Sequence, residues 1–361
     1  MLKQSIVITM AKYKVGMVGV GRGTAYGHIF SQHPDTEVVA LCDLNGEALE
    51  KNGKDFELAD NCLFENYEDM LNADVDIVVL GTPIPFQANQ TIKAMEAGKH
   101  VLCEVTAADN IPDCIRMVEA VRKSKTKFML AENCNYMHFV MEWNKEIKAG
   151  KIGTPFYAEA DYVHEIRGLV DGKWRANRAP LHYCSHSLGP VLLWMDDYIV
   201  RCTASGNQSR SFEKPTDGNI DIQVGLFETS KGATIKVLRS SVALRHPALC
   251  SYSIYGTKGA LESSRSSYNG TGYRYFEDYD PKEGTEIGIS YNDPNLPRSA
   301  AAGGHGNSEF YLVQDFLRSI EEDSTPPIDI VRGMDMTIPG LVAHEAAKRG
   351  GVWLDVPRIT D

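Results

Sequence analysis

Short apolar runs separated by amphipathic segments fill the first third of the chain, and this alternation limits the fold more than any other sequence feature. The apolar runs occupy residues 13–19, 37–42, 76–81, 99–104 and 127–132. Segments with apolar residues at helical spacing lie between them, at 45–56, 86–97 and 110–124. Nearly continuous apolar strands separated by helices are typical of a parallel sheet that helices cover on both faces. We therefore predict such an α/β domain over residues 13–133, after an N-terminal extension at 1–12.

The pattern changes after about residue 133, where strands begin to outnumber helices. A helix over 136–150 ends at Gly150, as helices often end at glycine. Strand candidates follow at 156–165, 199–206, 220–227, 233–239, 250–256 and 259–263. Residues 264–304 are rich in Ser, Tyr, Gly, Asp and Pro, and we expect an irregular excursion there, before helices near 307–321 and 332–348. The prediction for 134–361 is an α+β domain with an open, mostly antiparallel sheet.

Length and composition fit a globular protein of two domains. The chain has 361 residues, of which 43% are hydrophobic and 24% charged. The net charge of −11 argues against nucleic-acid or anionic-membrane partners, because both require a basic protein surface. No apolar stretch reaches the roughly 18 residues of a membrane span. The eight cysteines form no CxxC pair, which favours a reducing compartment, and we expect a cytoplasmic protein.

A glycine-rich turn follows the first predicted strand, with the sequence Gly19-Val20-Gly21-Arg22-Gly23-Thr24. Glycines between a strand and a helix let the backbone approach a pyrophosphate, as in a Rossmann domain. Thr24 stands where the usual pattern has its third glycine, so an ordinary tight turn is the alternative. Asp43 ends the second strand and can accept hydrogen bonds from ribose hydroxyls. Its charge favours NAD over NADP, although Arg22 could pair with a phosphate.

Other candidate cofactor contacts lie at the carboxyl ends of the later strands, where ligands bind in sheets of this kind. These residues are Thr82, Pro83, Glu104 and Asn133.

Titratable side chains are dense in residues 162–186. Tyr183 and His186 are three residues apart, so on a helix starting near 183 they share one face and could hold a hydroxyl between a donor and a base. The alternatives are a structural role for His186 and packing for Tyr183. His182 and His186 have a spacing that suits a metal, but no further ligand pattern accompanies them and we expect no metal. Candidate substrate contacts are Tyr162, His164, Arg167, Trp174, Arg175 and His305.

Three segments carry a family resemblance: residues 19–24, GKHVLCE at 98–104 and GTKGALE at 256–262. They resemble the Gfo/Idh/MocA oxidoreductases, and the resemblance extends over about 13–357. It implies a Rossmann domain, a C-terminal open α+β sheet, and a sugar bound between them over the nicotinamide. It also implies that the open sheet packs on another subunit, so that a homodimer or homotetramer is expected.

Two positions depart from that family's usual sequence. The family carries Glu-Lys-Pro after the fifth strand, and its lysine takes part in proton transfer, whereas this chain has Glu104-Val105-Thr106. Gln87 stands where many relatives have histidine. The resemblance therefore implies the fold but not the usual acid–base residue.

Residues 183–190, with the sequence YCSHSLGP, are similar to the Tyr-Pro-Thr-His-Gly-Leu-Gly-Pro stretch of glycoside hydrolase family 109. Residues 131–133, 174–175 and 304–306 also resemble that branch. This likeness implies a redox-neutral reaction through a 3-keto sugar, with NAD retained. Our leading hypothesis is an NAD-dependent oxidoreductase acting on a sugar or glycoside. The alternatives are an NAD-dependent glycosidase or lyase and a non-catalytic NAD-binding regulator.

Overall fold

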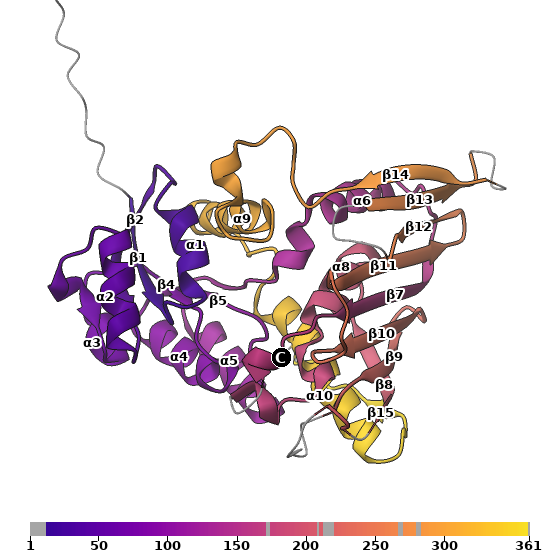
Figure 1. Cartoon of the computed structure of the whole chain (residues 1–361), viewed down its shortest axis with the longest axis horizontal. Helices are drawn as coiled ribbons and strands as arrows, with labels where there is room; N and C mark the ends of the chain where they lie inside the picture. The colour runs from indigo at the N-terminus through magenta and orange to yellow at the C-terminus, as the bar shows by residue number, and fades with distance from the viewer. Residues whose placement is uncertain are drawn as a thin grey trace, which may run out of the picture.

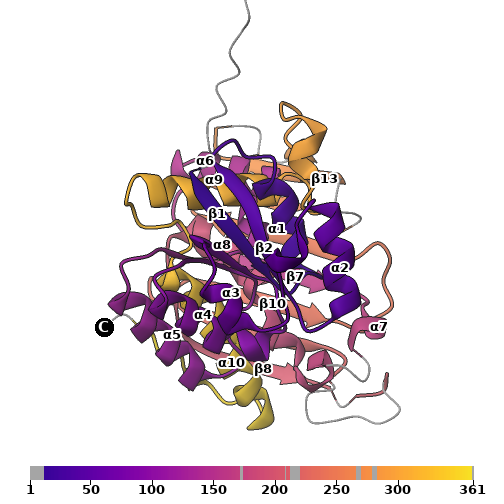
Figure 2. The ribbon, with the colours of Figure 1, turned by 90° about the vertical axis from the view of Figure 1, so that its left-hand side faces the viewer.

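The computed structural model describes residues 12–170, 174–207, 209–211, 220–265, 270–278 and 283–359. Residues 1–11 of the predicted N-terminal extension lie outside these ranges. Two sheets with helices around them make up the molecule (Figure 1). Viewed from the side of the first sheet, the second sheet lies behind it (Figure 2).

The first sheet is parallel and has the order β3-β2-β1-β4-β5-β6. Its strands are β1 (Tyr13–Val18), β2 (Thr36–Cys42), β3 (Leu63–Phe64), β4 (Ile77–Leu80), β5 (His100–Cys103) and β6 (Phe128–Leu130). The helices are α1 (Gly23–Phe30), α2 (Gly46–Asp55), α3 (Tyr67–Leu71), α4 (Ile84–Glu96) and α5 (Ile111–Lys123), with a 3₁₀ turn η1 (Asp60–Cys62). Every residue of β4 is buried, as expected for a central strand covered on both faces. The predicted Rossmann topology is confirmed.

The second sheet has the order β14-β13-β12-β11-β7-β10-β9-β8-β15. Its strands are β7 (Pro155–Val163), β8 (Ile199–Gly206), β9 (Gln223–Thr229), β10 (Thr234–Ser240), β11 (Leu249–Gly256), β12 (Gly259–Ser263), β13 (Gly270–Phe276), β14 (Thr285–Ile289) and β15 (Leu354–Asp355). The β7–β10 pair is parallel and the remaining pairs are antiparallel. The prediction of a mostly antiparallel sheet is confirmed.

The irregular excursion expected over 264–304 is wrong in part, because β13 and β14 lie within it. The sequence of β13 is GTGYRYF, in which glycine and partly exposed tyrosine hide the apolar alternation that marks most strands. Hydrogen-bonded pairing with neighbouring strands stabilises β13 instead. Leu261 of β12 lies opposite Arg274, and Gly272 lies opposite Ile287 of β14.

The remaining helices connect or cover the two sheets. They are η2 (Asn133–Tyr136), α6 (His138–Lys148), α7 (Arg167–Val170), η3 (Trp174–Asn177), η4 (Pro180–Tyr183), α8 (Ser185–Met195), η5 (Arg298–Ala301), α9 (Ser308–Glu321) and α10 (Ile330–Lys348). The last two contact helices of the first sheet: α9 packs on α1, and α10 packs on α5 as well as on β8 of the second sheet (Figure 1). Leu130 in β6 donates its amide hydrogen bond to the Ile328 carbonyl at 2.9 Å. Within the described ranges, no helix combines the length and apolarity needed to cross a bilayer.

Candidate active site

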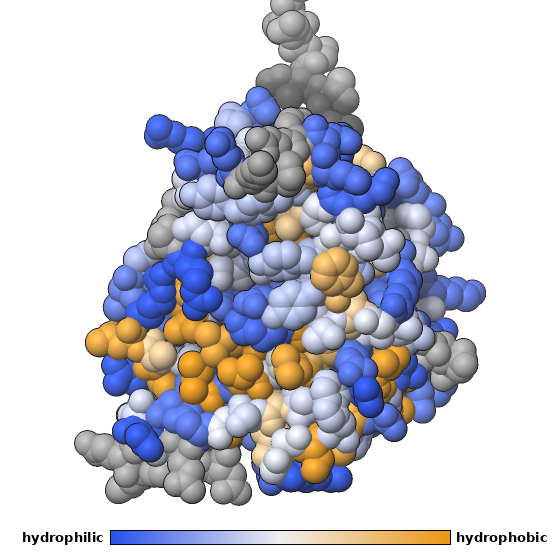
Figure 3. Space-filling model, turned by 90° about the vertical axis from the view of Figure 1, so that its right-hand side faces the viewer, coloured by the Kyte–Doolittle hydropathy of each residue, from blue (hydrophilic) through white to orange (hydrophobic). Residues whose placement is uncertain are grey.

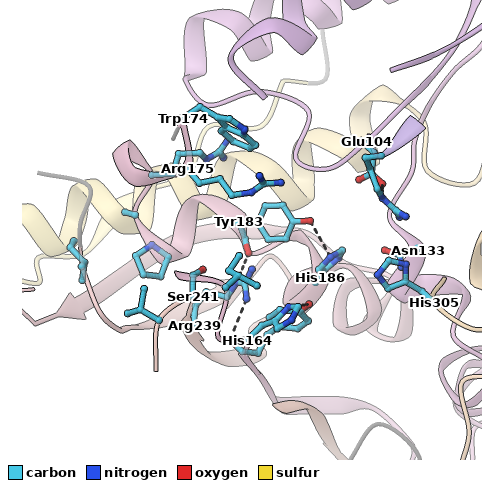
Figure 4. Close-up of a pocket in the computed structure, with 18 residues that line it drawn as sticks. Glu104, Asn133, His164, Trp174, Arg175, Tyr183, His186, Arg239, Ser241 and His305 are labelled. Atoms are coloured by element: carbon cyan, nitrogen blue, oxygen red, sulfur yellow. Dashed lines mark hydrogen bonds and ion pairs between the residues drawn. The ribbon is translucent and has the colours of Figure 1, made fainter. Parts of the chain in front are cut away.

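A cavity of about 240 Å³ lies between the carboxyl edge of the first sheet and the inner face of the second. The first sheet contributes residues that follow β1, β5 and β6, and the second contributes the ends of β7 and β10. Most of the polar residues predicted to bind cofactor or substrate line this cavity (Figure 4). Those that do are Arg22, Glu104, Asn133, Tyr162, His164, Trp174, Arg175, Tyr183, His186 and His305.

Tyr183, His186 and Glu132 form a hydrogen-bonded chain beside the cavity. Oη of Tyr183 lies 3.2 Å from Nε2 of His186 (Figure 4). Nδ1 of His186 lies 2.6 Å from Oε1 of Glu132. An ionised carboxylate only accepts hydrogen bonds, so it fixes the proton of a neutral imidazole on Nδ1. Nε2 is then free to accept a proton from Tyr183. This is the geometry of a base oriented by a carboxylate.

The local backbone places His186 differently from the sequence expectation. The helix does not start near residue 183: Tyr183 ends η4, and α8 begins at Ser185. The two side chains nevertheless meet, because the 3₁₀ turn leads directly into the helix. Oη of Tyr252 on β11 donates a hydrogen bond to the His186 carbonyl at 2.5 Å, which ties the start of α8 to the second sheet.

Burial raises the pKa of both acidic groups of this chain, but the net shifts of the two pKa values are opposite. Burial by itself favours protonation of Glu132. The charge and hydrogen bond of His186, together with Ser185 and the Cys134 amide, nonetheless hold the pKa of Glu132 below its usual range. Burial raises the pKa of Tyr183, and the charges of Glu104 and Glu132 add to this. Tyr183 is therefore a neutral phenol at physiological pH.

Arg239 on β10 supports the aromatic wall of the cavity. Its Nε donates to the Tyr183 carbonyl at 2.6 Å, and its Nη1 donates to the Tyr162 carbonyl at 3.3 Å. The guanidinium lies 4.2 Å from the ring centroid of Tyr162 and 5.0 Å from that of Tyr183. Oη of Tyr162 lies 3.3 Å from Nδ1 of His164. The second sheet thus presents an aromatic and cationic surface to the cavity.

A second cluster joins the first turn of the Rossmann fold to the loop before α9. Arg22 forms ion pairs with Glu104 and with Glu309, the latter at 3.1 Å. Nδ1 of His305 lies 2.6 Å from Oε1 of Glu309, and Nη1 of Arg22 approaches the Gly303 carbonyl at 3.4 Å. Burial lowers the pKa of Arg22, but the carboxylates of Glu104 and Glu309 outweigh it, so the net pKa is raised. Arg22 and His305 are therefore held where the first sheet meets the cavity.

The glycine-rich turn has the shape that a dinucleotide site requires. Gly19 has φ of +81°, and a Cβ atom there would lie 2.8 Å from the backbone of Gly81. Gly23 opens α1, whose first turn has neither a capping side chain nor an acidic residue, and Gly21 is exposed. The Gly23 amide donates to the Gly19 carbonyl at 2.9 Å and the Ala25 amide to the Arg22 carbonyl at 3.1 Å, so only part of this helix terminus is left for a pyrophosphate. Thr24 donates its hydroxyl hydrogen to the Val20 carbonyl at 2.9 Å.

Asp43 stands at the end of β2 next to this turn. Its Oδ2 accepts from the Val20 amide and its Oδ1 from the Asn45 amide, both at 2.9 Å. These bonds hold the carboxylate at the sheet edge where the ribose of a dinucleotide lies.

The later strand ends complete the same edge. Pro83 precedes α4, and the Thr82 carbonyl accepts from Nε2 of Gln87 at 3.0 Å. Nδ2 of Asn133 is buried and has no hydrogen-bond partner within the described ranges, although Asn133 lines the cavity. The turn, Asp43 and this orphaned amide are residues of the kind that a bound dinucleotide requires at this edge of the sheet.

Two predicted candidates lie elsewhere. Arg167 is not among the residues lining the cavity, and its Nε pairs with Oε1 of Glu165 at 2.8 Å. His182 does not face His186: its ring packs against His344, with centroids 4.6 Å apart. Trp174 and Arg175 both line the cavity, and the Arg175 guanidinium lies 4.3 Å from the Trp174 ring centroid.

The structure adds four charged residues to which the sequence analysis gave no role. These are Glu132, Arg178, Arg239 and Glu309. Glu132 ends the apolar run 127–132, and a carboxylate at the end of a buried strand is a signal that could have identified it. Arg178 lies in the segment already rich in titratable residues, whereas Arg239 and Glu309 carry no local signal.

Comparison with known proteins identifies the family to which both sheets belong. Residues 13–132 match the NAD-binding Rossmann fold of the GFO_IDH_MocA oxidoreductase family, and residues 144–353 match that family's C-terminal alpha/beta domain. This chain belongs to the Gfo/Idh/MocA oxidoreductase family. Two curated relatives are named glycosyl hydrolase family 109 proteins. The Solibacter usitatus protein is 28% identical, with 96% of this chain and 88% of the relative covered. The Shewanella pealeana protein is 25% identical, with 98% and 87% covered.

Two solved structures illustrate the same fold. A levoglucosan dehydrogenase in complex with NADH and L-sorbose superposes with a TM-score of 0.84 at 19% identity, covering 97% of this chain and all of that one. An aldose-aldose oxidoreductase from Caulobacter crescentus has a TM-score of 0.79 at 19% identity, covering 96% of this chain and 100% of that one. At these identities the likeness extends to the fold alone.

Proposed function

We propose that this protein is an NAD-dependent enzyme that oxidises a hydroxyl group of a sugar or glycoside, with Tyr183 and His186 as its proton-transfer pair. The hydrogen-bonded chain from Tyr183 through His186 to the buried Glu132 carries the proposal. The family lysine is replaced by Val105, so the proton must leave by another route, and this chain provides one beside the cavity.

NAD, when bound, supplies the acceptor for the hydride that leaves the sugar carbon. The glycine turn and Asp43 hold it at the edge of the first sheet, and the Asp43 carboxylate disfavours the 2′-phosphate of NADP. Glu104 and Asn133 border the end of the site that opens into the cavity.

The protein's own residues remove the hydroxyl proton. A substrate hydroxyl that donates to Oη of Tyr183 loses its proton to that oxygen, while Tyr183 passes its own proton to Nε2 of His186. The raised pKa of Tyr183 makes His186, rather than a tyrosinate, the final acceptor. The Glu132 carboxylate, 2.6 Å from Nδ1, stabilises the imidazolium that forms.

Sugar contacts are assigned to the second sheet and the segment before α8. Tyr162, His164 and Trp174 present aromatic surfaces, and Arg175 and His305 present donors, around the cavity. Arg167 is the weakest member of the predicted set, because its guanidinium already pairs with Glu165.

A second candidate function is redox-neutral cleavage of a glycoside. In that reaction oxidation of the sugar, loss of the leaving group, addition of water and re-reduction follow one another at one site. The glycosyl hydrolase family 109 relatives, at 25–28% identity over most of the chain, favour it, as does the missing lysine. The regulator alternative has no support of this kind, because a sensor does not need the Tyr183–His186–Glu132 chain.

Self-association is proposed through the outer face of the second sheet. Val224 and Leu226 alternate with buried neighbours along β9, are 38% and 39% exposed, and point away from the core. The face of the molecule on this side carries a broad hydrophobic band (Figure 3). Burying such a surface against a second copy gives a symmetric dimer, or a tetramer if a second contact forms.

The test uses purified, cofactor-stripped protein, added NAD and a panel of sugars and p-nitrophenyl glycosides. NADH that accumulates in proportion to substrate identifies a dehydrogenase. Nitrophenol release that requires NAD without net NADH identifies the redox-neutral glycosidase. If neither signal appears with any sugar, the proposal fails.

A further inference from the structure

The cavity holds more positive than negative charge, although the whole chain carries a net charge of −11. Four arginines line it, Arg22, Arg175, Arg178 and Arg239, against the single carboxylate of Glu104. That carboxylate is already occupied: Arg22 pairs with it, Tyr26 donates to Oε1 at 3.1 Å, and the Val105 amide donates to Oε2 at 2.9 Å. The other three guanidinium groups have no carboxylate within ion-pair distance in the described ranges, although the charge of Asp109 acts on Arg178 and that of Glu104 on Arg175.

None of these three forms an ion pair with any carboxylate in the described ranges. Nη2 of Arg178 donates to neutral acceptors, the Thr106 hydroxyl and the His182 carbonyl, both at 3.1 Å. Nη1 of Arg178 is inaccessible and lacks a partner among the described residues. The Arg175 guanidinium contacts the Trp174 ring, and Arg239 contacts two backbone carbonyls and two aromatic rings.

Other arginines of this protein are paired with carboxylates. Arg201 makes two hydrogen bonds to Glu228, at 2.6 and 2.8 Å, and Arg358 pairs with Asp335 at 3.1 and 3.2 Å. A buried charge without a partner is costly, and an enzyme retains such groups where a ligand completes them. Burial lowers the pKa of Arg178 to about 10 and also lowers that of Arg175, yet both stay protonated near neutral pH.

The dinucleotide does not account for these groups. Its pyrophosphate belongs at the glycine turn before α1, and Arg22 is the lining arginine that borders this turn. Arg175 and Arg178 come from the segment before α8, and Arg239 comes from β10. None of the three belongs to the first sheet, which carries the glycine turn. The close-up shows Arg175 reaching over Tyr183 and Arg239 beneath it, so the cations flank the proton-transfer pair (Figure 4).

We propose that the substrate is a carbohydrate bearing an anionic group, a carboxylate or a sulfate ester, which Arg175 and Arg178 bind with support from Arg239. This rests on the proposed function, because it names the substrate class of the same cavity. A planar guanidinium binds both oxyanions through paired hydrogen bonds, which a lysine ammonium does not reproduce.

The test measures binding directly, by calorimetric titration of the NAD-saturated full chain. The probes are methyl glucoside, methyl glucuronide and methyl glucoside 6-sulfate, and the same three forms of galactose. In at least one series we expect an anionic form to bind about 10-fold more tightly than its neutral parent, which equals about 1.4 kcal/mol. The tighter of the two anionic forms identifies the group as carboxylate or sulfate.

Three variants assign the preference to the arginines. Arg175→Gln is expected to abolish it, and Arg175→Lys to restore only part of it, because lysine keeps the charge but not the planar fork. Arg349→Gln, which removes an exposed arginine paired with Glu345 on α10, is expected to leave it unchanged. Unfolding curves of each variant verify that the fold is retained.

Equal or tighter binding of the neutral parents in both series would overturn the inference, as would a preference that survives Arg175→Gln or no binding of any anionic probe. Turnover is measured separately with the same sugars. A sugar that is turned over without anion preference defeats this inference alone. Selective binding of anionic sugars without turnover of any of them defeats the proposed function instead.

Discussion

Nδ1 of His186 lies 2.6 Å from Oε1 of Glu132, a carboxylate whose side chain has no exposed surface. The two residues are 54 positions apart, one after the last strand of the first sheet and the other at the start of α8. Their hydrogen bond fixes the imidazole at the boundary between the two sheets. The proposed proton route depends on this contact.

Replacement of His186 by alanine is expected to remove turnover while NAD still binds. General acid–base groups contribute roughly 10²–10⁴-fold to rate, so the rate constant kcat should fall by about that factor. His28→Ala, at an exposed position on α1, is the matched control and should retain the wild-type rate. Activity and NADH fluorescence titrations are measured on both. A variant lacking His186 that keeps full activity would remove His186 from the mechanism.

Replacement of Glu132 by glutamine tests the electrostatic part of the chain. The folded-state pKa of Glu132 lies below that of the unfolded chain, so its carboxylate stabilises the fold above its usual titration range. That contribution is lost as the pH falls through the lowered pKa. Glu132→Gln should therefore lower the free energy of unfolding by roughly 1.5–3 kcal/mol near pH 7. The difference should shrink below about pH 4.

Denaturant unfolding at several pH values measures this effect. Glu96→Gln replaces an exposed carboxylate at the end of α4 and should show no comparable loss. If Glu132→Gln lowers the free energy of unfolding by the same amount at neutral and acidic pH, the substitution disturbs packing and not a charge interaction.

Asp43→Asn is expected to relax cofactor selectivity. The asparagine keeps an oxygen that can accept from the Val20 amide, but it removes the charge that repels a 2′-phosphate. Binding of NADPH should strengthen relative to NADH, by about 10-fold or more if roughly 1.4 kcal/mol of repulsion is removed. Fluorescence titration with both reduced cofactors gives the ratio. An unchanged ratio would assign the selectivity to another residue.

Leu226→Lys is expected to weaken self-association. Leu226 is 39% exposed on the outer face of β9, and a charge at the centre of an apolar interface would have to be desolvated. Light scattering should show a shift towards monomer. Leu44→Lys, at a leucine that is 89% exposed near the end of β2, should leave the mass unchanged. Monomeric wild-type protein at micromolar concentration would refute the proposed association.

The sequence was sufficient for five of the six described strands of the first sheet, because these strands are largely apolar and alternate with helices. It missed β3, which has only two residues, Leu63 and Phe64. It was insufficient for β13 and β14, where glycine and tyrosine conceal a strand that exists through pairing with β12. Turn chemistry and strand ends identified Arg22, Glu104 and Asn133, since ligand groups collect at the carboxyl edge of a parallel sheet. The density of titratable side chains in residues 162–186 identified most of the other lining residues.

Contacts between distant residues could not be predicted from local pattern. Arg22 and Glu309 are 287 positions apart and meet only because α9 returns to the first sheet. Arg239 sits in a strand whose alternation alone does not distinguish an inward arginine from an exposed one. Arg167 was predicted to contact substrate because it lies in the titratable segment 162–186. Its guanidinium instead donates to Glu165, two residues away.

Stopped-flow absorbance under single-turnover conditions tests the central claim most directly. NAD-loaded protein in excess is mixed with each neutral and anionic sugar of the panel, and the absorbance of NADH is followed. With at least one sugar we predict a rise that persists for a dehydrogenase or decays for a redox-neutral glycosidase, and that is absent in His186→Ala. If no sugar produces NADH in the wild-type protein, or if His186→Ala produces it at the wild-type rate, the proposed chemistry is contradicted.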